Sequence, residues 1–127
     1  MACILEVNGV APEMGDNCWL APNATLVGDV KLGKNCTVWF NAVIRGDVNE
    51  IRIGDDTNIQ DGAVIHCTYK QAGTYLGNQV SIAHNAIVHG CTIHDRVLVG
   101  MGAIVMDGAI VHSDSVIAAG AVVLAGT

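Results

Sequence analysis

Aliphatic side chains recur every six residues along most of the chain. One uninterrupted run reads Leu20, Leu26, Leu32, Val38 and Ile44, and the same step returns from residue 93 to residue 123. The residue two positions before each aliphatic is usually small. A helix would repeat its apolar side chains every three or four residues, and a hairpin strand every second residue. The pattern therefore predicts neither of these elements.

Six residues suffice for one short strand and one turn. Three such units make a triangular coil, and successive coils stack at the spacing of a β-sheet, about 4.8 Å. We therefore predict an all-β fold, a single-stranded parallel β-helix forming one domain over residues 1–127. Residues 20–127 would form about six triangular coils, and residues 1–19 an N-terminal capping segment. A chance run of aliphatic residues in a β-sandwich would not hold this register for so long.

Three irregular steps interrupt the period. A step of nine follows Ile44 and a step of eleven follows Ile65, whereas a step of only five follows Val88. The two long steps predict loop insertions near residues 45–52 and 67–75, and the short step predicts a shortened corner.

Counting each step as one unit assigns the aliphatics to three faces of the coil. Face one is defined by Leu26, Ile44, Ile65, Val88, Val105 and Val123, face two by Leu32, Ile53, Leu76, Ile93 and Val111, and face three by Leu20, Val38, Ile59, Ile82, Val99 and Ile117.

The residue after each aliphatic should point outward, because strand side chains alternate. These outward residues include Met106 and Leu124 on face one and Trp39 on face three, whereas face two carries mainly glycine and histidine. Apolar outward side chains need covering. A cyclic homotrimer, with face one of one subunit against face three of the next, would cover both faces.

Composition narrows the class of partner. The chain is 51% hydrophobic but only 4% aromatic, and it carries 6 Lys and Arg against 12 Asp and Glu, a formal charge of -6. Such a charge disfavours nucleic acid and anionic lipid surfaces as partners. We find no signal-peptide pattern, no apolar run long enough to span a membrane, and no CxxC pair among the 5 cysteines. We expect a soluble, cytoplasmic protein that binds neither nucleic acid nor membranes.

Three of the histidines suggest a metal centre. His66 and His89 point outward from face one in successive coils, and His84 lies one position further along its strand of face three. Contact between these faces would bring two histidines of one subunit to one of its neighbour. Three imidazoles with a fourth position open to water form a catalytic zinc site, whereas structural zinc is usually enclosed by four protein ligands. His94 and His112 lie on face two and are expected to be surface residues.

Polar residues accompany these histidines. Arg45 and Asp61 each lie one coil before a candidate ligand. Opposed across the subunit interface they could form a charge-assisted pair, because a charge among apolar interface residues needs a partner. Asp47 could orient the same guanidinium, and the amide of Gln60 could hold the metal-bound water by hydrogen bonding. The alternative is that each of these side chains is simply solvated.

Motifs in the middle of the chain closely resemble those of the gamma-class carbonic anhydrase family, left-handed β-helix proteins of the hexapeptide-repeat superfamily. They read Arg45-Gly46-Asp47, Asn58-Ile59-Gln60-Asp61-Gly62 leading to His66, and His84-Asn85-Ala86-Ile87-Val88-His89-Gly90. The resemblance implies a left-handed β-helix and a homotrimer with metal sites at its subunit interfaces. The implied ligands match His66 and His89 of one subunit and His84 of the next, with Arg45, Asp47, Gln60 and Asp61 supporting the interface and the metal-bound solvent.

The reaction that this resemblance implies is a lyase reaction, the reversible hydration of carbon dioxide to bicarbonate by a metal-bound hydroxide. Imidazole ligands suit zinc, and iron or cobalt could occupy the same site. The chain departs from the family pattern at three places. Val48 stands where well-characterised members have a glutamate, the loop at 67–75 carries no carboxylate for proton transfer, and the sequence ends at Thr127 without the usual C-terminal helix.

Two other functions stay open at this stage. The chain could be a metal-binding or assembly protein with little or no turnover, or a hexapeptide-repeat acyltransferase that uses a single histidine as base. Cys67, beside a candidate ligand, is expected to be a small loop residue rather than a reactive thiol. Tyr69 and Tyr75 belong to the same loop, and the sequence assigns them no role.

Overall fold

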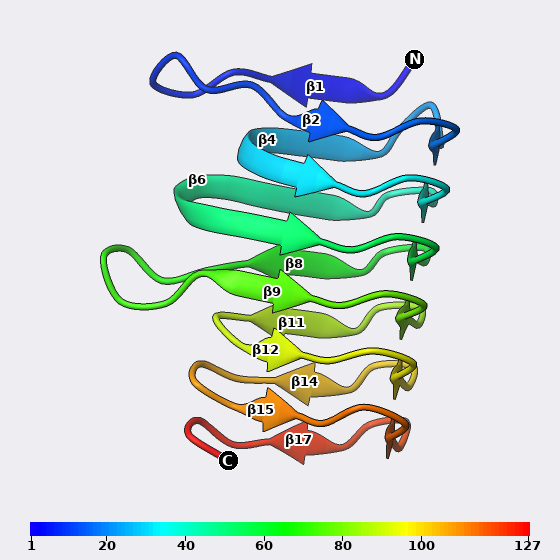
Figure 1. The fold of residues 1–127 in the computed structure, drawn as a ribbon, viewed down its shortest axis with the longest axis vertical. Helices are drawn as coiled ribbons and strands as arrows, with labels where there is room; N and C mark the ends of the chain where they lie inside the picture. Colours follow the sequence, from blue (N-terminus) through cyan, green and yellow to red (C-terminus); the bar gives the residue numbers. More distant parts are fainter.

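The protein is a parallel β-solenoid of about seven turns without any helix. The structure is a computed structural model that describes residues 1–127. The coils stack along the long axis, with the N-terminus at one end and the C-terminus at the other (Figure 1). Since there is no helix, none is available to cross a membrane.

The strands follow the three predicted faces. Face one contains β1 (Cys3–Leu5), the first part of β4 (Thr25–Leu32) and of β6 (Val43–Ile53), β8 (Val64–His66), β11 (Ile87–His89), β14 (Ile104–Val105) and β17 (Val122–Val123). Face two contains β2 (Glu13–Met14), the last part of β4 and β6, β9 (Thr74–Leu76), β12 (Thr92–Ile93) and β15 (Ile110–Val111). Face three contains β3 (Trp19–Leu20), β5 (Thr37–Val38), β7 (Asn58–Ile59), β10 (Ser81–Ile82), β13 (Leu98–Val99) and β16 (Val116–Ile117). Because β4 and β6 run around a corner, faces one and two join in an 11-stranded sheet, and face three is a separate 6-stranded sheet.

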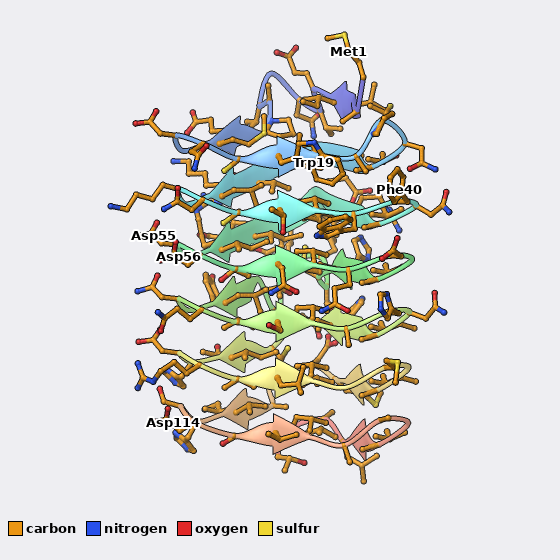
Figure 2. The ribbon with its side chains drawn as sticks, turned by 90° about the vertical axis from the view of Figure 1, so that its right-hand side faces the viewer. Met1, Trp19, Phe40, Asp55, Asp56 and Asp114 are labelled. Carbon is orange, nitrogen blue, oxygen red and sulfur yellow. The ribbon has the colours of Figure 1, made fainter.

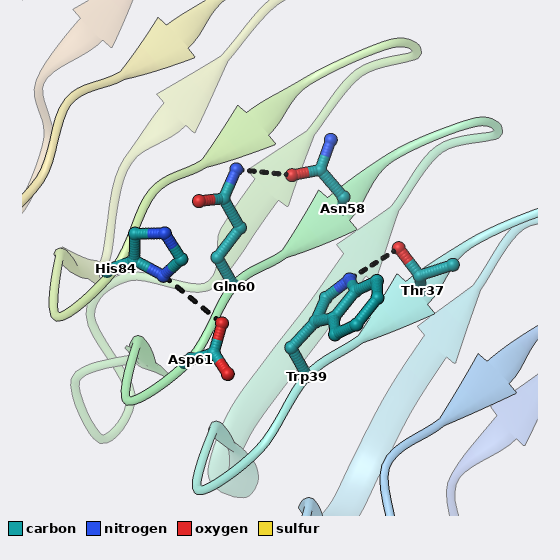
Figure 3. Close-up of a pocket in the computed structure, with 6 residues that line it drawn as sticks. All are labelled: Thr37, Trp39, Asn58, Gln60, Asp61 and His84. Carbon is teal, nitrogen blue, oxygen red and sulfur yellow. Dashed lines mark hydrogen bonds and ion pairs between the residues drawn. The ribbon is translucent and has the colours of Figure 1, made fainter.

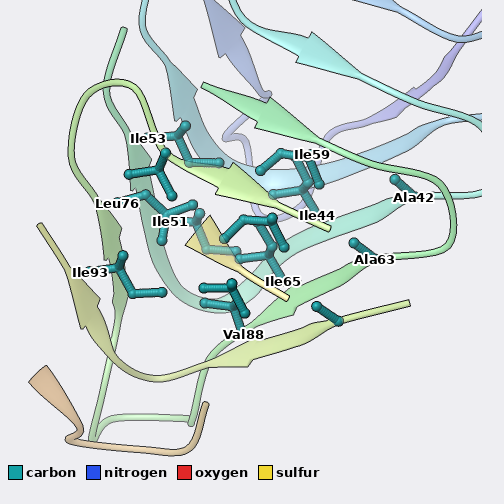
Figure 4. Packing of buried hydrophobic residues seen from close by; sticks show 14 of the residues in the cluster. Ala42, Ile44, Ile51, Ile53, Ile59, Ala63, Ile65, Leu76, Val88 and Ile93 are labelled. Carbon is teal, nitrogen blue, oxygen red and sulfur yellow. The ribbon is translucent and has the colours of Figure 1, made fainter. Parts of the chain in front are cut away.

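The strand register confirms the predicted columns. On face one, Ile44 pairs with Ile65 and Ile65 pairs with Val88, always in parallel strands. On face three, Ile59 pairs with Ile82 in the same way. All five side chains are almost fully buried. Ile44, Ile59, Ile65 and Val88 point into the interior of the coil (Figure 4). Each aliphatic therefore packs on its equivalents in the coils above and below, which is how a solenoid of small units builds a continuous core.

Asparagine and aspartate make the tight corner between faces two and three. The residues there with positive φ include Asn17, Asn35, Asp56 and Asp114. These residue types tolerate the left-handed conformation better than most others. Their side chains also bond from coil to coil, since the Asn35 amide donates to Asp56 Oδ1 at 3.0 Å. Asparagine or aspartate therefore favours this corner in four coils, whereas Gln79 and Arg96 adopt the same positive φ in the other two.

The N-terminal segment, which we predicted to cap the solenoid over residues 1–19, contributes a strand to the face-one ladder. Strand β1 pairs in parallel with β4, and Ile4 lies opposite Leu26, so this segment adds a coil to the about six predicted. The six-residue period could not reveal this coil. The spacing from Ile4 to Leu20 contains a short turn, closed by an antiparallel bridge between Val7 and Val10.

The two long steps have different structures. Residues 45–52 are not a loop, because β6 continues without a break around the corner. Gly28 pairs with Gly46 and Val30 with Ile51, so residues 47–50 of β6 bulge opposite Asp29 alone. Residues 67–73 form a loop that projects between β8 and β9 (Figure 1), with a bridge between Thr68 and Ala72.

Candidate metal centre

His66 and His89 lie one above the other at the corner between faces one and two. They end β8 and β11, and the two residues are directly paired in the parallel ladder. Their ring centroids are 5.2 Å apart, with the ring planes at 70°. The structure therefore brings these two candidate ligands together on adjacent coils, as the register from the sequence led us to expect.

A carboxylate approaches one nitrogen of each ring. Nε2 of His66 lies 3.0 Å from Oδ1 of Asp47, and Nδ1 of His89 lies 2.5 Å from Oδ1 of Asp107. Partial burial opposes ionisation of both carboxyl groups. Hydrogen bonds from His66 and Arg45 to Asp47 outweigh it and lower the pKa of that carboxyl. Bonds from Thr68 and His89 likewise lower the pKa of Asp107. Ionised carboxylates only accept, so in a neutral imidazole the ring nitrogen beside each one carries the proton and the opposite nitrogen presents its lone pair.

The bulge in β6 explains how Asp47 reaches His66. The additional residues turn the chain outward after Gly46, where a Cβ would lie only 2.6 Å from the carbonyl oxygen of Asp29. Asp47 also accepts a bond from Nη1 of Arg45 at 2.6 Å. The suggested orientation of this guanidinium by Asp47 is thus present within one chain.

His84 lies elsewhere, in the turn after β10 on face three. Its Nδ1 is 3.1 Å from Oδ1 of Asp61, which leaves Nε2 without a partner. Within the chain Asp61 therefore lies beside His84. Its pairing with Arg45 of a neighbouring subunit stays a prediction. His84 thus also has a carboxylate beside its ring, although this pair is more exposed than the pairs at His66 and His89.

His84 lines an open pocket of about 460 Å³. Its lining also contains Thr37, Trp39, Asn58, Gln60 and Asp61 (Figure 3). Nε2 of Gln60 donates to Oδ1 of Asn58 at 2.9 Å, so the amide oxygen of Gln60 is the atom that faces His84 (Figure 3). No group of three metal-binding side chains occurs within the single chain. A site with all three imidazoles needs a second subunit.

Asp107, Thr68 and Thr74 are site residues that sequence reasoning missed. Asp107 follows Met106, which occupies the outward position of face one in the coil after His89, so extending the outward column by one residue would have found it. The buried Thr74 hydroxyl donates to the carbonyl oxygen of His66 at 2.6 Å and accepts from the amide of Gly90 at 2.8 Å. No spacing rule predicts this link, because the loop length decides it.

The other residues of this corner are structural or exposed. Cys67 is buried, burial raises the pKa of its thiol, and the thiol donates to the carbonyl of Asn49 at 3.3 Å. These features support its interpretation as a packing residue. Val48 packs against the core, whereas Tyr69 and Tyr75 are exposed.

Apolar side chains are exposed on faces one and three, as predicted. On face three, Trp19, Trp39 and Phe40 form an aromatic cluster near the solenoid's N-terminal end (Figure 2), with the two indole centroids 4.8 Å apart. On face one, Met106 and Leu124 are 39% and 65% exposed. Both faces thus present surface that a neighbouring subunit could cover.

Comparison with known proteins defines the family. The family model described as bacterial transferase hexapeptide (six repeats) matches residues 11–46 and 90–125. A crystal structure of a hexapeptide transferase family protein from Anaplasma phagocytophilum superposes with a TM-score of 0.94 at 40% identity, covering 98% of this chain and 73% of that one. A putative acetyltransferase from Bacillus cereus gives a TM-score of 0.95 at 36% identity, with 99% and 73% covered. The chain therefore belongs to the hexapeptide-repeat family.

Within that family the chain is a homologue of proteins named gamma carbonic anhydrase, which confirms the resemblance found in the motifs. It is 38% identical to the mitochondrial gamma carbonic anhydrase 2 of Arabidopsis thaliana over 98% of this chain and 46% of the relative. It is 53% identical to a probable carbonic anhydrase of Methanocaldococcus jannaschii over 70% of this chain and 55% of the relative. The chain thus spans about half the length of these curated relatives.

Proposed function

We propose that the protein is a metal-dependent carbonic anhydrase that acts as a homotrimer. His66 and His89 of one subunit and His84 of the next would hold a divalent cation, with zinc as the first candidate. The reaction would be the reversible hydration of carbon dioxide to bicarbonate.

One observation carries the proposal: of the five histidines, only these three have a carboxylate at a ring nitrogen. Metal-binding histidines usually donate their second ring N–H to a carboxylate or a carbonyl group, which fixes the ring and leaves the other nitrogen for the metal. His94 and His112 instead stack on each other with centroids 5.7 Å apart. The supported histidines are therefore the ones whose free nitrogens are suited to a metal.

The donor set fits zinc. Neutral imidazoles suit zinc, iron and cobalt alike, and three of them leave a coordination position open for reactants. When bound, zinc supplies a Lewis acid that makes hydroxide available near neutral pH.

The chain's own residues would orient the reactants. Asp47 and Asp61 hold the rings of His66 and His84, and Asp47 also holds Arg45. Because the amide nitrogen of Gln60 is engaged by Asn58, its oxygen is free to accept a hydrogen bond from the attacking water. That bond would direct a lone pair of the water towards the carbon of carbon dioxide.

Metal content and hydration rate test the proposal together. The zinc-loaded protein should hold about one zinc per chain, since a cyclic trimer has three equivalent interfaces. It should also accelerate carbon dioxide hydration above the buffer rate in a stopped-flow assay. His84→Ala should lose both the zinc and the activity. The double variant His94→Ala/His112→Ala should keep both, which controls for zinc bound at the surface.

Two results would overturn the proposal. Full zinc occupancy without hydration would make the protein a metal-binding homologue without turnover. A metal-free protein that binds coenzyme A would instead favour acyl transfer, the class named for the related Bacillus cereus structure.

A further inference from the structure

Asp107 uses both of its carboxylate oxygens at the histidine corner. It lies in the turn after β14, one coil beyond His89. Oδ1 lies 2.5 Å from Nδ1 of His89, and Oδ2 accepts a hydrogen bond from the hydroxyl of Thr68. Thr68 belongs to the loop that follows His66, 39 residues before Asp107. The carboxylate therefore joins three successive coils.

These bonds fix the orientation of the His89 ring. The hydroxyl of Thr68 has its own proton to donate, so the carboxylate is the acceptor on both sides. His89 must then donate from Nδ1, and its Nε2 carries the lone pair. Turning the ring over would break this bond and would leave the partly buried carboxylate short of one donor.

The backbone beside His89 leaves room for this contact. Gly90 has φ +62°, and a Cβ at this position would lie 2.8 Å from Cγ of Asp107. The same Gly90 amide donates to Thr74, whose hydroxyl also holds the carbonyl of His66. The loop at 67–73 is thus anchored at its first residues by Thr68 and, just beyond its end, by Thr74.

We propose that Asp107 is the positioning residue of His89, that Thr68 holds Asp107 in place, and that the loop at 67–73 serves to bring Thr68 there. The inference rests on the proposed metal site and deepens it. In this proposal neither Asp107 nor Thr68 would contact the cation. They present Nε2 of His89 in one orientation before the cation arrives.

Two measurements test this on the full chain. The first is zinc affinity, by competition with a chromophoric chelator. Loss of a carboxylate that supports a metal-binding histidine typically costs about 10–100-fold in affinity, so we expect such a loss for Asp107→Asn and a smaller one for Thr68→Val. Asp114→Asn, on a corner remote from the candidate ligands, should bind zinc like the wild type.

The second measurement is the protonation pattern of the His89 ring in the metal-free protein, by nitrogen-15 NMR of the imidazoles. We expect the Nδ1–H form in the wild type and a mixture of both neutral forms in Asp107→Asn. Circular dichroism and sedimentation show whether each variant keeps its fold and assembly, and Thr68→Val gives a second test if Asp107→Asn misfolds.

The outcomes separate the two proposals. If the wild type binds no zinc, the proposed function fails, but the NMR measurement still decides whether Asp107 sets the His89 ring. If zinc binds and Asp107→Asn matches the wild type in affinity and ring protonation, the positioning role is wrong while the metal site stands. An equal loss of zinc affinity in Asp114→Asn would also contradict a specific role.

Discussion

Two pairs of histidines stand on adjacent coils of this solenoid, and their surroundings differ completely. His66 and His89 lie with rings 5.2 Å apart and inclined at 70°, each beside a carboxylate. His94 and His112 lie 5.7 Å apart with planes only 2° from parallel, and no carboxylate pairs with them. The coil spacing is the same, so the repeat by itself does not make a metal site.

The difference arises from the corners that follow each pair. After His94 and His112, the nearby aspartates are already committed to the backbone and to another side chain. Asp95 accepts from the amide of Asn78 at 2.8 Å, and Asp114 accepts from Nε of Arg96 at 2.7 Å. Beside His66, the bulge in β6 brings Asp47 to the ring. Asp107 reaches His89 from a regular six-residue step and is also bound by Thr68 of the loop at 67–73. Irregular segments of the solenoid thus supply Asp47 and Thr68, two of the residues around the candidate ligands.

Removing one histidine from each pair should give the largest contrast. His89→Ala removes a proposed ligand, so zinc affinity should fall by more than the roughly 100-fold that loss of a supporting carboxylate can cause. His94→Ala should leave the affinity unchanged. Competition with a chelator measures both, and an equal loss in the two variants would remove the distinction between the pairs.

Two glycines provide a stability comparison. Gly90 and Gly102 both have positive φ, but a Cβ would meet Asp107 at Gly90 and nothing within 4 Å at Gly102. Gly102→Ala should therefore cost about 1 kcal/mol, from backbone strain alone. Gly90→Ala should cost about 2–3 kcal/mol, because the contact with Asp107 adds to the strain. Urea unfolding of the metal-free variants measures both values, and equal costs would show that Asp107 does not press on this turn.

A smaller difference is expected between Asp47 and Asp114 in how each affects the stability of the fold as the pH is lowered. Bonds from His66 and Arg45 lower the pKa of Asp47, and a bond from Arg96 lowers the pKa of Asp114. A carboxyl whose pKa is lower in the folded state than in the unfolded state stabilises the fold. This stabilisation is fully present at pH values above the pKa of the unfolded state, about 3.9, and it disappears as the pH falls through the pKa of the folded state.

Asp47→Asn and Asp114→Asn should therefore each destabilise the metal-free protein at pH 7 and have little effect in strong acid. Asp47 is 23% exposed and Asp114 is 65% exposed, so solvent screening should make the Asp114 effect the weaker one. Thermal unfolding across the acid range tests this order. A larger effect at Asp114, or one that grows in acid, would contradict it.

The regular part of the molecule could be predicted from the sequence almost completely. From Leu20 to Val123, every column of aliphatic side chains lies where the six-residue period places it. Strand side chains alternate in direction, so each short strand points one aliphatic side chain into the interior. The first coil escaped the prediction because Ile4 is out of step with that period. The step after Ile44 was expected to be a loop, but the chain stays in β6 and absorbs the additional residues in a bulge.

The candidate site could be predicted only in part. Register sufficed to place His66 over His89, because pairing in a ladder follows from counting residues. It could not show that Asp61 reaches His84, or that Asp107 and Thr68 meet, since these contacts depend on side-chain directions at corners. Asp47 and Thr68 lie in segments where the period fails, whereas Asp61 and Asp107 lie in regular six-residue steps.

Mixing two inactive variants tests most directly whether the site is shared between subunits. His84→Ala and His89→Ala should each bind no zinc at this site alone. When the two are unfolded together and reassembled, each mixed trimer should contain one interface with all three histidines, which for random mixing restores about a quarter of the wild-type zinc content. Zinc recovery near that level would support a cation shared by two chains. No recovery in verified mixed trimers, or full zinc binding by either variant alone, would contradict it.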